Sequence, residues 1–259
     1  MDSMLVFDRR AVRHHRDRAA RTVDRVADVL RDAAERLLDR LEDTNRQFTD
    51  VLDVGGRGVV APLLRARGLQ VVSCDLSAAM AAVNGGPCVV ADEECLPFAS
   101  ASFDLIVASL SLHWVNDLPG ALLQLRQALR PEGLLLASLP ALGTLAGLRS
   151  ALTEAEVEVS GGASPRVSPF PELRDCAHLL QRAGFALPVA DVEEIRLLYA
   201  DPFALLMDLR AGGETNAIRE RQRTVPDRRL FPAALARMPM DGDRAEATLR
   251  MAVMTGWAP

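Results

Sequence analysis

Short apolar runs alternate with helical stretches between residues 50 and 140, and this alternation limits the fold more than any other feature of the sequence. The apolar runs are typical of buried strands and lie at 51–54, 70–74, 88–91, 103–109 and 134–139. The stretches between them predict helices, notably at 62–67, 78–83 and 118–129. Buried strands that are joined through helices form a parallel, doubly wound α/β sheet. Ligands of such sheets bind beyond the carboxyl ends of the strands.

The segment before the alternation is predicted to cover the sheet. Apolar residues recur at helical spacing from Val23 to Leu41, with charged residues between them, which predicts one long amphipathic helix. We therefore expect residues 1–48 to form a helical lid or cover and residues 49–259 to form the sheet domain.

The segment after Pro140 is predicted to complete that domain. Its apolar patterns predict helices at 144–159, 172–183 and 202–210, and strands at 189–199 and 248–257. We expect two cover segments within it, at about 144–185 and 202–240.

Composition excludes several classes of chemistry. All 30 basic residues are arginine, so no lysine is present for a P-loop or a Schiff base. The four cysteines and four histidines contain no Cys-x-x-Cys or His-x-x-x-His pair, so we predict no metal site. The net charge of −5 gives no reason to expect nucleic acid as a partner.

The hydropathy pattern bears on location. No apolar run approaches the roughly 20 residues that span a bilayer. The first ten residues contain too few apolar side chains to form the apolar region of a signal peptide. We interpret the protein as cytoplasmic, without a membrane span but compatible with peripheral membrane association.

Acidic residues and a glycine turn follow the predicted strands. Asp53-Val-Gly-Gly-Arg-Gly follows the first strand, and Asp75 ends the second strand about twenty residues later. Asp92 and Glu93 follow the third strand. Three acidic strand ends around one glycine turn accept hydrogen bonds from hydroxyl and amino groups and repel a pyrophosphate, which favours S-adenosylmethionine over NAD. The alternative is a simple tight turn with aspartates that cap helices.

These motifs resemble those of the class I S-adenosylmethionine-dependent methyltransferases. The matching segments are Asp53-x-Gly55, Asp75-Leu-Ser, Ala91-Asp92-x-x-x-Leu-Pro-Phe98 and Ser102-Phe-Asp-Leu-Ile-Val107. The resemblance implies a Rossmann-like sheet of seven strands in which the last strand, 248–257, runs antiparallel.

The resemblance also implies roles for individual residues. Gly55 and its turn approach the methionine portion of the cofactor, Asp75 takes the ribose hydroxyls, and Asp92 takes the adenine amino group. The full set of candidate cofactor-binding residues is Asp53, Gly55, Gly56, Arg57, Asp75, Leu76, Asp92, Glu93 and Ser109. The usual loop reads Asp-x-Gly-x-Gly-x-Gly, whereas the loop here either is one residue shorter or has Arg57 and Val59 at glycine positions. Arg57 either forms a salt bridge with the cofactor's carboxylate or fills its place.

A closer resemblance extends over nearly the whole chain. It is to the methyltransferase-like assembly factors of respiratory complex I, and its segments include Phe7-Asp8-Arg9, Ser111 to Pro119, Gly161 to Phe170 and Gly212-Gly-Glu-Thr-Asn216. Eukaryotic members of that family are organellar and are linked to hydroxylation of an arginine. A cousin is the methyltransferase that esterifies malonyl carrier protein in biotin synthesis. The resemblance implies a protein substrate, in particular an iron–sulfur subunit of complex I.

His113 and Trp114 are the candidate catalytic residues, because they follow the fourth strand, where acceptor and methyl group meet. A histidine there is a suitable general base. Alternatively the pair forms a wall, with Trp114 beside the adenine or the substrate and His113 hydrogen-bonded to Asn116 or Asp117. We favour the wall, because methyl transfer from a sulfonium needs little more than in-line positioning.

Two arginine clusters complete the candidates. The first is Arg9, Arg10, Arg13, Arg16, Arg18 and Arg21, which form either a lid for an acidic partner or a solvated helical face. The second is Arg219, Arg221, Arg223, Arg228 and Arg229, which fit an acidic protein surface or a solvent-exposed loop.

We therefore predict a methyltransferase-like enzyme that modifies a protein side chain, by methylation or arginine hydroxylation. One alternative is a methyltransferase for a small molecule or a carrier-protein carboxyl group. The other is a non-catalytic interaction protein that has lost the cofactor.

Overall fold

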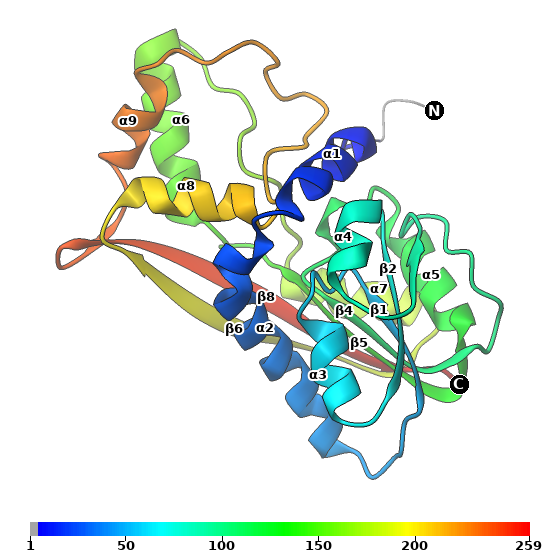
Figure 1. Ribbon diagram of the computed structural model, residues 1–259. Helices are drawn as coiled ribbons and strands as arrows, with labels where there is room; N and C mark the ends of the chain where they lie inside the picture. The colour runs from blue at the N-terminus through cyan, green and yellow to red at the C-terminus, as the bar shows by residue number, and fades with distance from the viewer. Residues whose placement is uncertain (1–4) are drawn as a thin grey trace.

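The chain forms one twisted sheet with helices on both faces in the computed structural model, which describes residues 5–259 (Figure 1). Residues 1–4, which begin both the predicted cover 1–48 and the segment considered as a signal peptide, lie outside the described residues. The strands are β1 Asp50–Val54, β2 Gln70–Asp75, β3 Cys88–Val90, β4 Phe103–Ser109, β5 Leu129–Pro140, β6 Ala186–Tyr199, β7 Met240–Asp241 and β8 Arg244–Trp257. Their order is β3-β2-β1-β4-β5-β8-β6, and β7 pairs with β8.

The direction of the strands confirms the predicted fold class. Strands β1 to β5 pair in parallel, and β8 runs antiparallel to both β5 and β6. The resemblance implied seven strands, but the described residues form eight, because the short β7 folds back onto the start of β8. The chain leaves β1 toward β2 on one side and returns to β4 on the other. The carboxyl ends of β1 and β4 therefore flank the switch point at which doubly wound sheets bind ligands.

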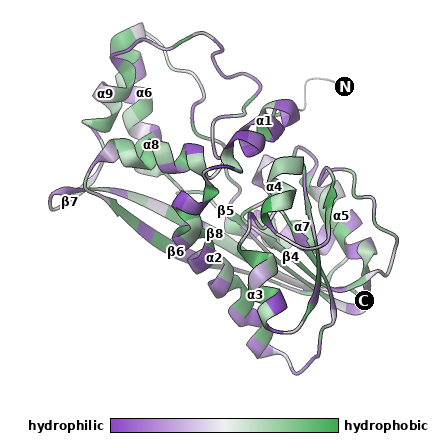
Figure 2. Cartoon of the chain, viewed as in Figure 1, coloured by the Kyte–Doolittle hydropathy of each residue, from purple (hydrophilic) through white to green (hydrophobic). Residues whose placement is uncertain are grey.

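The helices are α1 Arg9–Ala19, α2 Ala27–Leu38, α3 Val60–Ala66, α4 Ala78–Val83, α5 Leu118–Ala128, α6 Ala146–Ser160, α7 Leu173–Arg182, α8 Pro202–Ala211 and α9 Leu230–Leu235. All seven residues of β4 are buried, and a strand that is buried on both faces has to be mostly apolar. Leu105 and Val107 face the core under α2 and α3, whereas Ile106 and Ala108 face the core under α5 and α7. Hydrophobic colouring follows these central strands (Figure 2).

The N-terminal segment differs from the predicted single helix. Residues 23–43 form a 3₁₀ turn at Val23–Val26, then α2, then a second 3₁₀ turn at Asp39–Asp43. Helix α1 is separate, because the chain leaves helical geometry at Thr22, where φ is −137°. The Asp8 carboxylate caps α1 by accepting from the amide of Ala11 at 3.1 Å. Helix α1 contacts α4 and α8 and so lies across the carboxyl ends of the strands (Figure 1).

Helices α6, α8 and α9 form a cap over one end of the long antiparallel pair of β6 and β8 (Figure 1). Leu148 and Leu152 of α6 pack there against Leu205 of α8 and Leu230 of α9. Helix α7 also falls within the predicted cover segment 144–185, but it packs in the core of the main sheet. No helix among residues 5–259 combines the length and the apolar character needed to cross a membrane.

Candidate functional site

The backbone of the turn after β1 packs closely against the neighbouring residues. Gly55 has φ of +69°, and its amide donates to the carbonyl of Cys74 at 2.8 Å, which ties the turn to the end of β2. A Cβ at Gly55 would lie 2.7 Å from Cβ of Ser111 and 3.2 Å from Nη1 of Arg16. Only glycine therefore fits this position, both for its backbone geometry and for its neighbours.

Asp53 is fully buried beneath that turn. Its Oδ2 accepts from the Ser73 hydroxyl at 3.4 Å, while its buried Oδ1 has no hydrogen-bond partner among the described residues. Burial raises the pKa of Asp53 to about 7, and the negative charge of Asp75 adds to the shift. A Cβ at Gly56 would lie 2.3 Å from both carboxylate oxygens of Asp53, so Gly56 packs directly on this carboxyl group.

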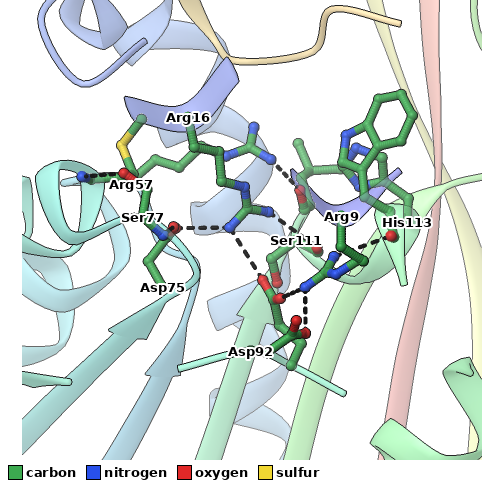
Figure 3. Close-up of polar contacts among 12 residues, drawn as sticks. Arg9, Arg16, Arg57, Asp75, Ser77, Asp92, Ser111 and His113 are labelled. Carbon is green, nitrogen blue, oxygen red and sulfur yellow. Dashed lines mark hydrogen bonds and ion pairs between the residues drawn. The ribbon is translucent and has the colours of Figure 1, made fainter. Parts of the chain in front are cut away.

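Asp75, at the end of β2, is paired with an arginine from α1. Nη1 of Arg16 donates to Asp75 Oδ2 at 2.8 Å and to Glu93 Oε1 at 3.2 Å (Figure 3). Nη2 of Arg16 donates to the carbonyl of Ser111 at 3.3 Å. The side chains of Arg16 and Asp75 are 2% and 0% exposed. Burial raises the pKa of Asp75 and the Glu93 charge adds to this, while Arg16 opposes the shift.

Asp92 and Glu93, after β3, hold a second arginine from α1. Arg9 Nη2 donates to Asp92 Oδ1 at 2.6 Å and also to the carboxylate of Glu93 (Figure 3). Arg9 Nη1 donates to the carbonyl of Trp114 at 3.1 Å. Two arginines of one helix thus occupy the carboxylates at two neighbouring strand ends.

A third buried arginine lies on the other side of the glycine turn. Arg57 has φ of +50° and forms an ion pair with Glu214 at 2.6 Å. His113 Nε2 and Trp114 Nε1 lie 2.7 and 2.8 Å from Oε2 of the same Glu214. Burial acts to raise the pKa of Glu214, but His113 and Arg57 outweigh it and hold that pKa well below its usual range.

The predicted partners of His113 were wrong. Its ring contacts Glu214, which lies 101 residues further along the chain, and neither Asn116 nor Asp117. Asn116 instead accepts from the amide of Phe7 at 2.8 Å, and Asp117 caps α5.

The two other candidates lie at the edge of the cluster. Leu76 packs against the apolar group of Phe7, Val12 and Trp114. Ser109 is 6% exposed at the carboxyl end of β4, where its backbone pairs with Ser138 of β5. All nine predicted cofactor residues therefore lie at or beside the carboxyl ends of β1 to β4.

Sequence reasoning missed the part that Arg9, Arg16 and Glu214 play in this site. The arginines of α1 were expected to meet an acidic partner or solvent, but Arg16 is buried and Arg9 half-buried against the chain's own carboxylates. A signal was available, since Arg16 lies on one helical stripe with the buried Val12 and Ala19. No group of His, Cys, Asp and Glu within residues 5–259 is arranged to hold a metal ion.

Comparison with known proteins identifies the family. A family model described as a methyltransferase domain matches residues 13–188. The chain belongs to this methyltransferase family. Membership confirms the prediction of a methyltransferase-like enzyme with S-adenosylmethionine as its cofactor.

Individual relatives extend the similarity over nearly the whole chain. The chain is 35% identical over 268 residues to the mitochondrial arginine-hydroxylase NDUFAF5 of Danio rerio, covering 99% of this chain and 84% of the relative. It is 37% identical over 243 residues to the malonyl-[acyl-carrier protein] O-methyltransferase of Xylella fastidiosa, covering 89% and 80%. The crystal structure of the YcgJ protein from Bacillus subtilis has a similar fold, with a TM-score of 0.58 at 15% identity over 86% of this chain and 97% of that one. These matches confirm both predicted resemblances.

Proposed function

We propose that the protein uses S-adenosylmethionine at the strand-end cluster to modify a protein side chain during assembly of respiratory complex I. The observation that carries this proposal is the similarity of nearly the whole chain to proteins named as arginine hydroxylases, at 35% identity over 99% of the chain for Danio rerio and 38% over 97% for Homo sapiens. The proposed substrate is an arginine on an iron–sulfur subunit of the complex. The cytoplasmic location predicted from the sequence stays a prediction, which cell fractionation tests.

The residues at the strand ends fit the cofactor. The Gly55 turn offers a cradle that a Cβ would fill, and two buried oxygen atoms beside it, Asp53 Oδ1 and Ser111 Oγ, lack hydrogen-bond partners among the described residues. We assign Asp75 to the ribose hydroxyls and Asp92 to the adenine amino group. When bound, S-adenosylmethionine supplies an electrophilic methyl group on its sulfonium.

The arginines of α1 set a condition on this assignment. Asp75 is fully buried against Arg16, so it has to exchange this partner before it contacts a nucleoside, whereas Asp92 is bonded to Arg9 but keeps a partly exposed side chain. Leu76, Glu93 and Ser109 frame the same space.

His113 and Trp114 are assigned to the wall beside the reacting group. Both side chains are hydrogen-bonded to one carboxylate, Glu214, which fixes their orientation at the end of β4. Arg57 is held by the same carboxylate and donates to the carbonyl of Leu110 at 2.6 Å. These contacts orient the wall and exclude water from it.

The proposal is tested by mass spectrometry of complex I subunits from a wild-type strain and from a strain that lacks this gene. Only in the wild-type strain should an arginine carry an added methyl group, which S-adenosylmethionine supplies, or an added oxygen atom, which needs molecular oxygen and a two-electron reductant as co-reactants. Asp75→Asn should abolish the change, while Asp32→Asn, on the outer face of α2, should not. Identical modification states of the subunits and normal complex I in both strains would refute the proposal.

A second candidate function is methylation of a carrier-protein carboxyl group. It is favoured by the 37% identity to the malonyl-[acyl-carrier protein] O-methyltransferase of Xylella fastidiosa. Growth of a biotin auxotroph that lacks its carboxyl methyltransferase, after introduction of this gene, would favour this function over the first.

A third candidate is an interaction protein without catalysis. It is favoured by Arg16, which fills the space beside Gly55 and Asp75 with its own guanidinium. Calorimetric titration with S-adenosylmethionine and S-adenosylhomocysteine separates it from the other two, because folded protein that binds neither ligand would support it.

A further inference from the structure

Strand β6 has a long backbone edge that no strand of the sheet covers. It is the last strand in the order of the sheet, and within residues 5–259 it pairs with β8 alone (Figure 1). It has 14 residues, whereas β3, at the other end of the sheet, has three. An edge of this length presents a row of backbone N–H and C=O groups that can pair with a strand of another chain.

The contacts of β8 determine which backbone groups of β6 point outward. The carbonyl of Arg250 in β8 accepts at 2.8 Å from the amide of Ala141, which continues β5, and so points away from β6. Backbone groups of successive residues point to opposite sides of a strand. The next residue, Met251, therefore points toward β6, where it lies opposite Glu193. Glu193 and every second residue along β6 bond to β8, whereas Glu194 and its even-numbered neighbours point outward.

The outward-pointing residues in the regular part of the strand are Val192, Glu194, Arg196 and Leu198. Nη1 of Arg36 donates to the carbonyl of Glu194 at 3.3 Å from outside the sheet, which agrees with this direction. That oxygen has a second lone pair for another donor. The amides of these four residues receive no backbone partner from another element within the described part of the chain.

The side chains of the same four residues lie on one face of the strand, because residues two apart share a face. Val192 and Leu198 are 37% and 41% exposed, although both are apolar. The side chains of Glu194 and Arg196 are 49% and 55% exposed, so each has room for a further partner of opposite charge. The order along the strand is thus apolar, acidic, basic, apolar.

This order is self-complementary about Ile195. An antiparallel copy of β6 centred on Ile195 places Glu194 opposite Arg196 of the second copy, and Val192 opposite Leu198 of the second copy. All four residues point outward, so the residues of each pair exchange both backbone hydrogen bonds. Opposite charges and apolar side chains directly across from each other stabilise an antiparallel pair.

Neighbouring registers lack this match. A shift of the centre by one position, to Glu194 or to Arg196, places that side chain opposite its own copy, and like charges across a strand pair are destabilising. On the other face of β6, the register centred on Ile195 places the acids Asp191 and Glu193 opposite uncharged residues. Charge therefore favours one register of self-pairing.

We propose that two copies of this chain associate through β6, in antiparallel register centred on Ile195, and join their sheets into one. The interface is isologous, so each copy contributes the same four outward-pointing residues. The proposal goes beyond the proposed function, because it involves neither the cofactor nor the residues at the strand ends.

The first test is sedimentation equilibrium of the full chain between about 1 µM and about 1 mM, a range that includes the affinities of weak interfaces. The average mass of the wild-type protein should rise with concentration from that of the monomer to that of the dimer. A chain that stays monomeric over this range would overturn the proposal, and so would a dimer that keeps its β6 amides open to hydrogen exchange.

Charge reversal tests the register. Arg196→Glu places two acids opposite each other at both ends of the two-fold pair and should raise the dissociation constant at least about tenfold. Glu194→Arg should do the same with two arginines. An equimolar mixture of these two variants should dimerise like the wild type, because each acid then faces an arginine. Variants that dimerise alone as well as the wild type, or a mixture that stays monomeric, would overturn the register.

Two further variants separate pairing from folding. Arg229→Glu is the matched control, because Arg229 is also an exposed arginine bonded to an aspartate but lies outside β6, and it should dimerise like the wild type. Val192→Pro replaces the charge variants if thermal unfolding shows that they do not fold. It removes one outward N–H without changing any charge, and proline is tolerated where the N–H of an edge strand faces solvent. It should also weaken the dimer at least about tenfold, and an unchanged dissociation constant would overturn the proposal.

Discussion

Replacing Arg16 with glutamine should destabilise the fold and strengthen nucleoside binding in the same variant. Arg16 is the cation between two buried carboxylates, with Asp75 at 2.8 Å and Glu93 at 3.2 Å. It also fills the space beside Gly55. The same side chain therefore stabilises the two buried carboxylates and competes for the one that we assign to the ribose.

The size of each effect follows from the burial of the pair. Arg16 and Asp75 are 2% and 0% exposed, and breaking a pair this deeply buried costs about 3 to 5 kcal/mol. For a chain of this length that loss lowers the melting temperature by about 6 to 20 °C. The wild-type protein must break the same pair to bind a nucleoside, whereas the variant has no pair to break. At about 1.4 kcal/mol per tenfold, removal of that cost should raise the affinity of the variant by about 100-fold to a few thousandfold.

The assay pairs thermal unfolding with calorimetric titration of 5′-methylthioadenosine. This thioether has the ribose and adenine of the cofactor but lacks its carboxylate, so it reports on Asp75 and Asp92 alone. Arg13→Gln is the control, because Arg13 is an exposed residue of the same helix. It should change neither the melting temperature nor the affinity.

Weaker binding of 5′-methylthioadenosine by Arg16→Gln than by Arg13→Gln would refute the competition. It would mean that Arg16 helps to form the nucleoside site. An unchanged melting temperature would refute the energetic argument, because it would show that Asp75 and Glu93 need no cation.

Three further substitutions test the site around the glycine turn. Asp53 has its pKa raised from 3.8 to about 7, so the wild-type protein should lose about 4 kcal/mol of stability as the pH rises from about 4 to above 7. Asp53→Asn should flatten that slope in urea unfolding at several pH values, and parallel slopes would contradict the prediction. Gly56→Ala places a Cβ 2.3 Å from the Asp53 carboxylate and should cost about 1 to 3 kcal/mol, whereas Gly162→Ala, with no atom within 4 Å, should be neutral. Glu214→Gln breaks the ion pair with Arg57 and should cost about 3 kcal/mol by the same measurement.

The sheet and the placement of its acids follow from local sequence patterns. A buried parallel strand is a short apolar run, and the residue after it lies at the ligand-binding edge, so Asp53, Asp75 and Asp92 could be placed together from their positions alone. Strand ends were less predictable. The strand predicted at 134–139 begins at Leu129 instead, because the backbone of Leu129 already pairs with Phe103 of β4.

The partners of the buried arginines do not follow from such patterns. Arg16 and Asp75 are 59 residues apart, and Arg57 and Glu214 are further apart still, so their contacts depend on how α1 and the loop after α8 pack on the sheet. The helix of Arg16 is rich in charge and was interpreted as either solvated or partner-binding. Tertiary packing overrides that interpretation, because the acids beneath α1 have to be neutralised once they are buried.

That requirement links the position of α1 to the state of the site. A methyltransferase sheet places Asp75, Asp92 and Glu93 together at its edge, and burying Asp75 and Glu93 without a cation is unfavourable. Arg16 and Arg9 supply the cations, and a planar guanidinium suits this task because it can donate to two carboxylates at once. The Arg16 contacts that hold α1 on the sheet are thus the contacts that keep Asp75 from a nucleoside. A ligand that takes Asp75 must weaken the hold on α1, and by linkage a partner that draws α1 away must strengthen binding of that ligand by the same factor.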